Sequence, residues 1–230
     1  MSLYDLVIKN AEIITAADHY HGDIAIRDGK IVSISGQLAQ SDAAEVIDAK
    51  GRRVTPGGVD AHCHLDQASD DGSVGADDFF TGTRSAACGG TTTVIPFAMQ
   101  FKGQSLAEAV ADYHRWAGGK ACVDYSFHLI ITDATPAVIA EIPQMVAQGY
   151  TSFKIYMTYD ALNLSDSHIL DVLEATRQCG ALALFHPENE DFMSWLTPRL
   201  KPRGKTATPY PALAPSELCE RLATPKPTSS

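Results

Sequence analysis

The stretch Thr55-Pro-Gly-Gly-Val-Asp-Ala-His-Cys-His-Leu-Asp66 decides the interpretation of this sequence. An apolar run that begins at Val59 ends in two histidines, His62 and His64, with one residue between them. Residues i and i+2 of a β-strand share a face, so a strand here would direct both imidazoles to one side and Cys63 to the other. The two histidines can therefore chelate one metal ion.

Further apolar, strand-like runs follow this stretch at regular intervals. They begin near Val59, Thr91, Val123, Ser152 and Ala181, at steps of 32, 32, 29 and 29 residues. Each step has the length of a βα unit. Helical spacing occupies the segments between them, residues 77–88, 106–117, 137–148 and 166–179, and Ser105-Leu-Ala-Glu108 is a capping box. Five successive βα units predict a parallel sheet.

Residues that can do chemistry stand near the carboxyl ends of three of these strands. His62 and His64 end the first strand, Lys154 lies in the fourth, and His186 ends the fifth. In (β/α)8 barrels the active site is built on this face. The fold class that the sequence predicts is therefore α/β, with a partial (β/α)8 TIM-type barrel in residues 58–200.

The two ends of the chain depart from the βα pattern. Before Gly57, four short alternating runs predict a small antiparallel β-sheet, half of a β-sandwich, in residues 1–57: residues 5–9, 22–27, 30–34 and 45–48. The Asp28-Gly29 pair is typical of a tight hairpin.

Residues 201–230, rich in Pro, Thr, Ser and Lys, predict an irregular polar tail with room for one short helix at 216–222. Only 173 residues follow Gly57, whereas a complete barrel has about 250, so we expect a truncated barrel of about five βα units.

Composition excludes several kinds of partner. The net charge of −10, with no basic cluster, argues against nucleic acid and against an anionic membrane surface. The N-terminus lacks the basic start and long apolar stretch of a signal peptide, and no later segment is apolar enough to span a bilayer. We therefore expect a cytoplasmic protein that acts on a small molecule.

Four motifs, in order, resemble those of dihydropyrimidinases and hydantoinases of the amidohydrolase superfamily. They are Pro56-Gly-Gly-Val-Asp-Ala-His-Cys-His-Leu-Asp66, Gly89-Gly-Thr-Thr-Thr-Val94, Ser152-Phe-Lys-Ile-Tyr-Met-Thr-Tyr159 and Leu184-Phe-His-Pro-Glu-Asn189, and Gly204-Lys-Thr206 accompanies them. The resemblance covers nearly the whole chain. It implies a metal-dependent cyclic amidohydrolase that opens 5,6-dihydropyrimidine or hydantoin rings to N-carbamoyl amino acids.

The resemblance also implies a role for each site residue. His62 and His64 match the ligands of a first metal ion, and His186 matches a ligand of a second. Lys154 matches the lysine that carbon dioxide converts to an N-carboxylate bridging both ions, which we expect to be zinc. Tyr159 matches a tyrosine that faces the substrate, a cyclic ureide or imide.

Physical chemistry agrees with the role of the lysine. Two metal ions about 3.5–4 Å apart need an anionic bridge, which an ordinary ammonium group does not supply. A neutral amine can add carbon dioxide, and desolvation lowers a lysine pKa in the direction that this requires. A hydroxide shared by the two ions would then attack the ring carbonyl, with Tyr159 donating a hydrogen bond to the developing oxyanion.

Two alternatives remain open at this point. One is a non-catalytic scaffold, or pseudoenzyme, like the inactive relatives of dihydropyrimidinase, because the family also uses a histidine from the sixth strand and an aspartate from the eighth. The other is a relative of the allantoinase or dihydroorotase type, against which the spacing of residues 152–159 argues. A truncated barrel would also expose the edge of its fifth strand, so we expect a homo-oligomer or other self-association.

Two other groups of polar residues have a structural interpretation. His128, in the third strand, is predicted to be a core histidine with one hydrogen bond rather than a ligand. Asn189 and Glu190, after the fifth strand, are predicted to cap the helix that follows.

Overall fold

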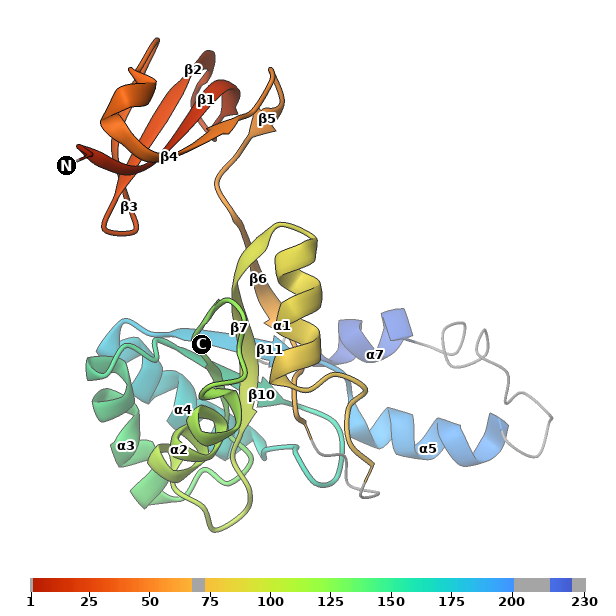
Figure 1. Cartoon of the computed structure of the whole chain (residues 1–230). Helices are drawn as coiled ribbons and strands as arrows, with labels where there is room; N and C mark the ends of the chain where they lie inside the picture. The colour runs from red at the N-terminus through yellow and green to blue at the C-terminus, as the bar shows by residue number, and fades with distance from the viewer. Residues whose placement is uncertain (1, 68–72, 201–215, 225–230) are drawn as a thin grey trace. The chain divides into compact units, whose positions relative to one another are not determined.

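The structure is a computed structural model of the 230-residue chain and describes residues 2–67, 73–200 and 216–224 (Figure 1). It divides into two compact units, Met1–Gly58 and Val59–Ser230. Within the described residues no helix has the length and apolar character needed to cross a membrane.

The first unit is a five-stranded sheet built on the predicted alternation of apolar and polar residues. Strands β1 (Tyr4–Ile14), β2 (His19–Arg27) and β3 (Lys30–Ser35) pair antiparallel. Asp28 and Gly29 join β2 to β3 with φ angles of 52° and 69°. Both residues are thus in the left-handed region that the favoured two-residue hairpin requires, which confirms the predicted turn.

The predicted antiparallel character of this sheet is wrong for its last strands. Strands β4 (Ala43–Asp48) and β5 (Arg53–Val54) both pair with β1 in parallel. The connection after β3, which includes a 3-10 turn at Gln40–Asp42, returns the chain to the edge of β1 that β2 leaves free. The chain arrives there running in the direction of β1, so the sheet is mixed.

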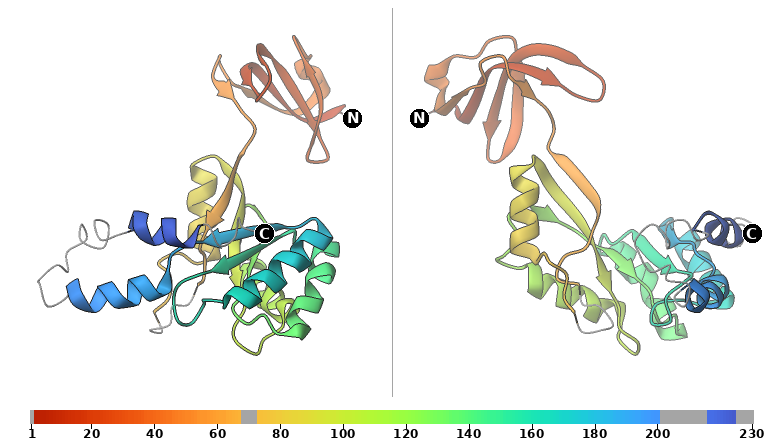
Figure 2. Two further views of the ribbon diagram at one scale, coloured as in Figure 1. Left: turned by 180° about the vertical axis from the view of Figure 1, so that it is seen from behind. Right: turned by 90° about the vertical axis from the view of Figure 1, so that its right-hand side faces the viewer.

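The second unit contains the curled parallel sheet of a half-barrel. Its strands follow the order β11-β10-β9-β7-β6 (Figure 2), with β6 at Gly58–Cys63, β7 at Thr91–Met99, β9 at His128–Ile130, β10 at Ser152–Tyr156 and β11 at Leu182–His186. Parallel pairing joins β11 to β10, β10 to β9 and β9 to β7. This arrangement confirms the predicted partial TIM-type fold.

The third strand of the barrel is divided into two pieces, whereas the sequence predicts one run. The first piece, β8 (Asp124–Tyr125), pairs with β7 at Thr93 and Val94, and β9 pairs with β7 from Phe97 onward. The pairing of β8 and β9 with β7 places the gap between the two pieces opposite Pro96 of β7. Because proline has no N–H to donate to the ladder, the regular pairing is interrupted there.

Four helices connect the strands of the second unit, and each lies within two residues of its predicted bounds. They are α1 (Phe79–Cys88), α2 (Leu106–Ala117), α3 (Pro136–Ala147) and α4 (Asp166–Cys179). Helix α5 (Glu190–Leu200) follows β11, and α7 (Ser216–Ala223) confirms the short helix predicted near 216–222. The rest of the predicted polar tail, residues 201–215 and 225–230, lies outside the described residues.

The predicted capping box at the start of α2 is present. Ser105 Oγ accepts a hydrogen bond from the Glu108 N–H at 3.1 Å, and the Glu108 carboxylate accepts one from the Ser105 N–H at 2.9 Å. We expect Ser105→Ala to lower the free energy of unfolding by about 1 kcal/mol, measured by urea denaturation. Ser85→Ala, at an exposed position within α1, is the control, and an equal loss in both variants would contradict the capping role.

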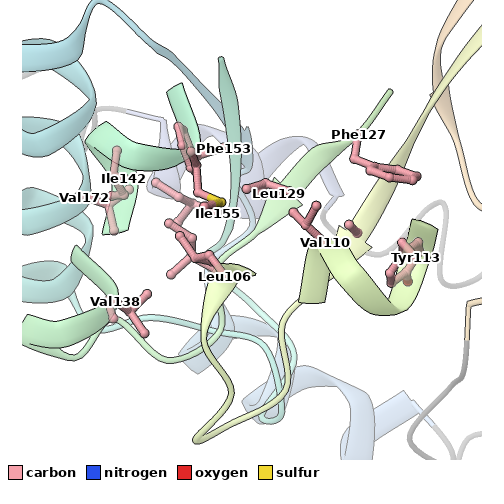
Figure 3. Close-up of a cluster of buried hydrophobic side chains, with 14 of the residues drawn as sticks. Leu106, Val110, Tyr113, Phe127, Leu129, Val138, Ile142, Phe153, Ile155 and Val172 are labelled. Carbon is pink, nitrogen blue, oxygen red and sulfur yellow. The ribbon is translucent and has the colours of Figure 1, made fainter. Parts of the chain in front are cut away.

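The main core lies between this sheet and the helices that cover it (Figure 3). Side chains of α2, α3 and α4 pack against those of β9 and β10: Leu106, Val110, Tyr113, Val138, Ile142 and Val172 against Leu129, Phe153 and Ile155. Each large side chain buried here contributes about 1.5–3 kcal/mol. Residues on the other side of β7, β9 and β10 form a smaller cluster of Phe97, Met99, Ile130 and Tyr156. Because strand residues alternate in direction, this cluster marks the opposite face, which we call the inner face.

Candidate active site

His62 and His64 lie where β6 ends, and both rings reach the inner face. Their centroids are 5.6 Å apart, and the ring of Phe97 in β7 packs against both, at 4.7 Å from His62 and 5.1 Å from His64. Cys63, between them, packs instead against the main core. The predicted division of this stretch between two faces is confirmed.

The surroundings of His62 favour its neutral form. Partial burial is the main cause that lowers the pKa of His62, and the positive charges of His64 and Lys154 lower it further. Asp60 acts in the other direction, and its carboxylate accepts a hydrogen bond from the His62 backbone N–H at 3.0 Å. A neutral imidazole at neutral pH has a free nitrogen lone pair, which a metal ligand requires.

Lys154 lies in the middle of β10, a strand whose five residues are all buried. Its side-chain Nζ lies 5.7 Å from the ring centroid of Phe97 and 5.2 Å from that of Tyr156, and only 5% of the residue is exposed. Among the residues that the structure describes, no carboxylate lies within ion-pair distance of this amine. Burial lowers the pKa of Lys154, so the neutral amine is easier to form than in water.

His186 ends β11, directly beside the end of β10. The parallel register pairs Tyr156 with His186, and the two rings stack with centroids 5.4 Å apart. Glu188 Oε2 accepts a hydrogen bond from His186 Nε2 at 2.8 Å. Through Tyr156, which also contacts Lys154, His186 adjoins the lysine.

Tyr159 lies beyond β10 with a φ of 70°, in the left-handed region that few non-glycine residues adopt. Its ring centroid is 5.5 Å from that of His186. The carboxylate of Glu190 accepts hydrogen bonds from the Tyr159 N–H at 2.8 Å and from Thr158 Oγ1 at 2.6 Å. Burial raises the pKa of Tyr159, and the negative charges of Glu188 and Glu190 raise it further, so the phenol stays protonated at neutral pH.

The two residues predicted to cap α5 have different roles. Asn189 Oδ1 accepts a hydrogen bond from the Phe192 N–H at 2.9 Å, which confirms the cap. Glu190 begins α5, but its carboxylate reaches across to hold the backbone of Tyr159. For Glu190 the prediction of a simple helix cap is therefore incomplete, because the connection after β10 folds back onto the start of α5.

The predicted site residues thus form one continuous strip along the inner face. Phe97 joins His62 and His64 to Lys154, and Tyr156 joins Lys154 to His186 and Tyr159. Within the described ranges, no three His, Cys, Asp or Glu side chains gather closely enough to hold a metal ion by themselves. In the sheet order, β10 lies between β11 and β6. Lys154 therefore lies between His186 on one side and the pair His62 and His64 on the other.

The two aromatic residues that connect this strip, Phe97 and Tyr156, were not predicted from the sequence. Tyr156 carried a usable signal, because it stands two residues after Lys154 and must share its face of the strand. Phe97 carried none, because it lies within an ordinary apolar strand and meets the histidines only through the register of β7 beside β6.

A family model described as "Amidohydrolase family" matches residues 53–201, more than half of the chain. The chain belongs to the amidohydrolase family. Among curated relatives, a D-hydantoinase of Ralstonia pickettii is 42% identical over 96% of this chain and 48% of its own length. A D-hydantoinase of Geobacillus stearothermophilus is 45% identical over 92% of this chain and 45% of its own.

Solved structures agree with the sequence comparison. A D-hydantoinase structure superposes on this chain with a TM-score of 0.90 and 42% identity, covering 96% of this chain and 48% of the other. Dihydropyrimidinase from Brevibacillus agri gives a TM-score of 0.89 and 40% identity, with 95% and 47% covered. The chain spans about half the length of the curated relatives it matches, and the predicted resemblance is confirmed.

Proposed function

We propose that this chain carries the metal site of a cyclic amidohydrolase that opens hydantoin or 5,6-dihydropyrimidine rings to N-carbamoyl amino acids. The observation that carries the proposal is the strip on the inner face, in which a buried lysine, with no acidic partner among the described residues, lies between the pair His62 and His64 and the single His186. The identity to D-hydantoinases over nearly the whole chain supports this class of substrate.

The donor atoms of the strip fit divalent metal ions such as zinc. His62 and His64 would hold one ion and His186 another, since neutral imidazole is a ligand that zinc prefers. Bound there, the ions would act as Lewis acids that polarise the ring carbonyl and lower the pKa of an attacking water.

Lys154 would supply the anionic group that this donor set lacks. Its neutral Nζ would attack the carbon of carbon dioxide, forming an N–C bond and releasing one proton, so that the side chain ends in a carboxylate. The lowered pKa of Lys154 increases the fraction of neutral amine that can react.

Tyr159 would donate a hydrogen bond to the oxyanion that develops as the ring opens. We expect Tyr159→Phe to lower kcat for hydantoin hydrolysis by about 10²–10³-fold, the usual effect of removing one such donor. Steady-state kinetics would measure it, with the exposed Tyr20→Phe in the first unit as control. Unchanged kcat in a folded Tyr159→Phe variant would exclude the phenol from this role.

The proposed activity is tested with the purified 230-residue chain, zinc and bicarbonate, on dihydrouracil and on a 5-substituted hydantoin. We expect N-carbamoyl products from the wild type and none from Lys154→Ala. Zinc content, measured on the same samples, shows whether the site is loaded. A folded, zinc-loaded wild type that opens neither ring would contradict the proposal for this chain.

We also propose that the chain works in the cytoplasm and self-associates through the edge of β11. Within the described part of the chain, β11 pairs on one side only, and Leu182 at its start is 57% exposed. Such an edge is a template for pairing with another chain. Sedimentation velocity should show oligomers that grow with concentration, and a monomer at every concentration would contradict this.

A further inference from the structure

His128 in β9 is buried and uses both of its ring nitrogens. Nε2 lies 3.0 Å from the backbone oxygen of Ala61, and Nδ1 bonds to the hydroxyl of Ser152. The carbonyl oxygen of Ala61 can only accept, so Nε2 carries the hydrogen. The predicted core position of His128 is confirmed, since 8% of the residue is exposed, but the single hydrogen bond is wrong, because residues far apart in the sequence meet on both sides of the ring.

The two partners of His128 stand beside the proposed metal ligands. Ala61 directly precedes His62 in β6, and Ser152 lies two residues before Lys154 on the same face of β10. The histidine therefore connects the strand that carries the first ligands to the strand that carries the lysine.

This connection skips a strand, which the backbone ladder cannot do. In the sheet order, β7 lies between β9 and β6, and the His128 ring lies over Phe97 of β7 at a centroid distance of 5.1 Å. Strand β6 is at the end of that order, and every residue in it except Cys63 is exposed. Among the described residues, β6 also pairs with β7, and Cys63 packs against the main core, so the bond to Ala61 adds a side-chain attachment directly before His62.

We propose that His128 is a positioning residue that ties β6 to β10 and thereby sets the separation of His62 from Lys154. This role rests on the proposed function and goes beyond it, because His128 itself contributes no ligand. Outer hydrogen bonds of this kind keep ligands in the geometry that the metal needs, and losing one typically weakens metal binding about 10–100-fold.

Two polar substitutions at His128 distinguish the loss of its hydrogen bond to Ala61 from a general loss of stability. In His128→Gln the amide nitrogen reaches the place of Nε2 and can still donate to Ala61 O. In His128→Asn the shorter side chain ends near the place of Nδ1, so it can bond to Ser152 but not to Ala61. His114→Asn is the control, because the His114 ring also bonds at both nitrogens, to the hydroxyls of Tyr125 and Tyr150, away from β6.

The first measurement is the affinity for zinc in the presence of bicarbonate, and the second is backbone hydrogen exchange without metal. We expect His128→Asn to lose about 10–100-fold in zinc affinity, with His128→Gln and His114→Asn within about threefold of the wild type. Without metal, residues 59–64 should exchange at least about 10-fold faster in His128→Asn, while the exchange of α2 and α3 stays unchanged.

Equal hydrogen exchange of residues 59–64 in His128→Asn and His128→Gln would overturn the proposal. Equal zinc affinity of these two variants would overturn it as well. If the wild type binds no zinc, the proposed function fails, but the exchange measurement still decides whether His128 holds β6. Faster exchange throughout the second unit in His128→Asn would show a merely structural role and would also overturn the proposal.

Discussion

Lys154→Met is expected to abolish zinc binding by the strip while stabilising the metal-free fold by about 1–4 kcal/mol. Methionine is unbranched and flexible enough to fill the space between Phe97 and Tyr156 without a charge. The attraction between the ammonium and those rings stabilises the folded chain by about 2 kcal/mol. Removing that ammonium from water costs several kcal/mol, so the wild type keeps the lysine at a net cost in stability.

The same substitution is expected to alter how stability depends on pH. Burial lowers the pKa of Lys154 in the folded chain below its ordinary value of 10.5. Between the folded and the ordinary pKa, the unfolded chain binds more protons at this residue, so its contribution to stability rises with pH. Below the pKa of Lys154 in the folded chain, the full cost of burying the charged ammonium lowers the stability. Lys154→Met should remove that rise.

Urea unfolding at several alkaline pH values, with a chelator and without bicarbonate, measures both effects. Lys120→Met, at an exposed position after α2, is the matched control and should leave stability and its pH slope unchanged. A Lys154→Met variant that is less stable than the wild type, or that still binds zinc at the wild-type level, would contradict the account of this lysine.

Phe153→Ala is expected to destabilise the second unit by about 3–5 kcal/mol. Phe153 is fully buried in β10 and packs against the core that α2, α3 and α4 cover (Figure 3). Removing the ring loses its burial and leaves a cavity that a packed core cannot close completely.

Fluorescence-detected urea unfolding isolates this effect, because both tryptophans, Trp116 and Trp195, belong to the second unit. Phe101→Ala is the control, since Phe101 is 48% exposed and its loss should change stability by about 0.5 kcal/mol or less. Similar losses in the two variants would show that the core does not lie where Figure 3 places it.

Local sequence signals predicted most of the fold because each rests on short-range geometry. The period of the strands placed His62 and His64 on one face, the Asp28-Gly29 pair marked a hairpin, and Ser105 marked the start of a helix. The parallel pairing of β4 with β1 escaped prediction, because the direction of a strand depends on the path of the connection before it. The break opposite Pro96 required the register between two strands.

The candidate site was predictable in its reactive residues but not in their setting. Motif spacing pointed to His62, Lys154 and His186, which the structure brings into one strip. The rings of Phe97 and Tyr156 that connect them, and the bonds of His128 to two other strands, depend on which side chains meet across the sheet. Pairings of that kind leave no local pattern in a single sequence.

We propose above that Lys154 becomes an anionic ligand between two metal ions. The most direct measurement is carbon-13 NMR of the chain with zinc and labelled bicarbonate, comparing the wild type with Lys154→Met and measuring bound zinc on each sample. We expect a carbamate carbon in the wild type, together with two zinc ions per chain, and neither in the variant. Two bound zinc ions without a carbamate signal, or a signal that survives in Lys154→Met, would contradict it.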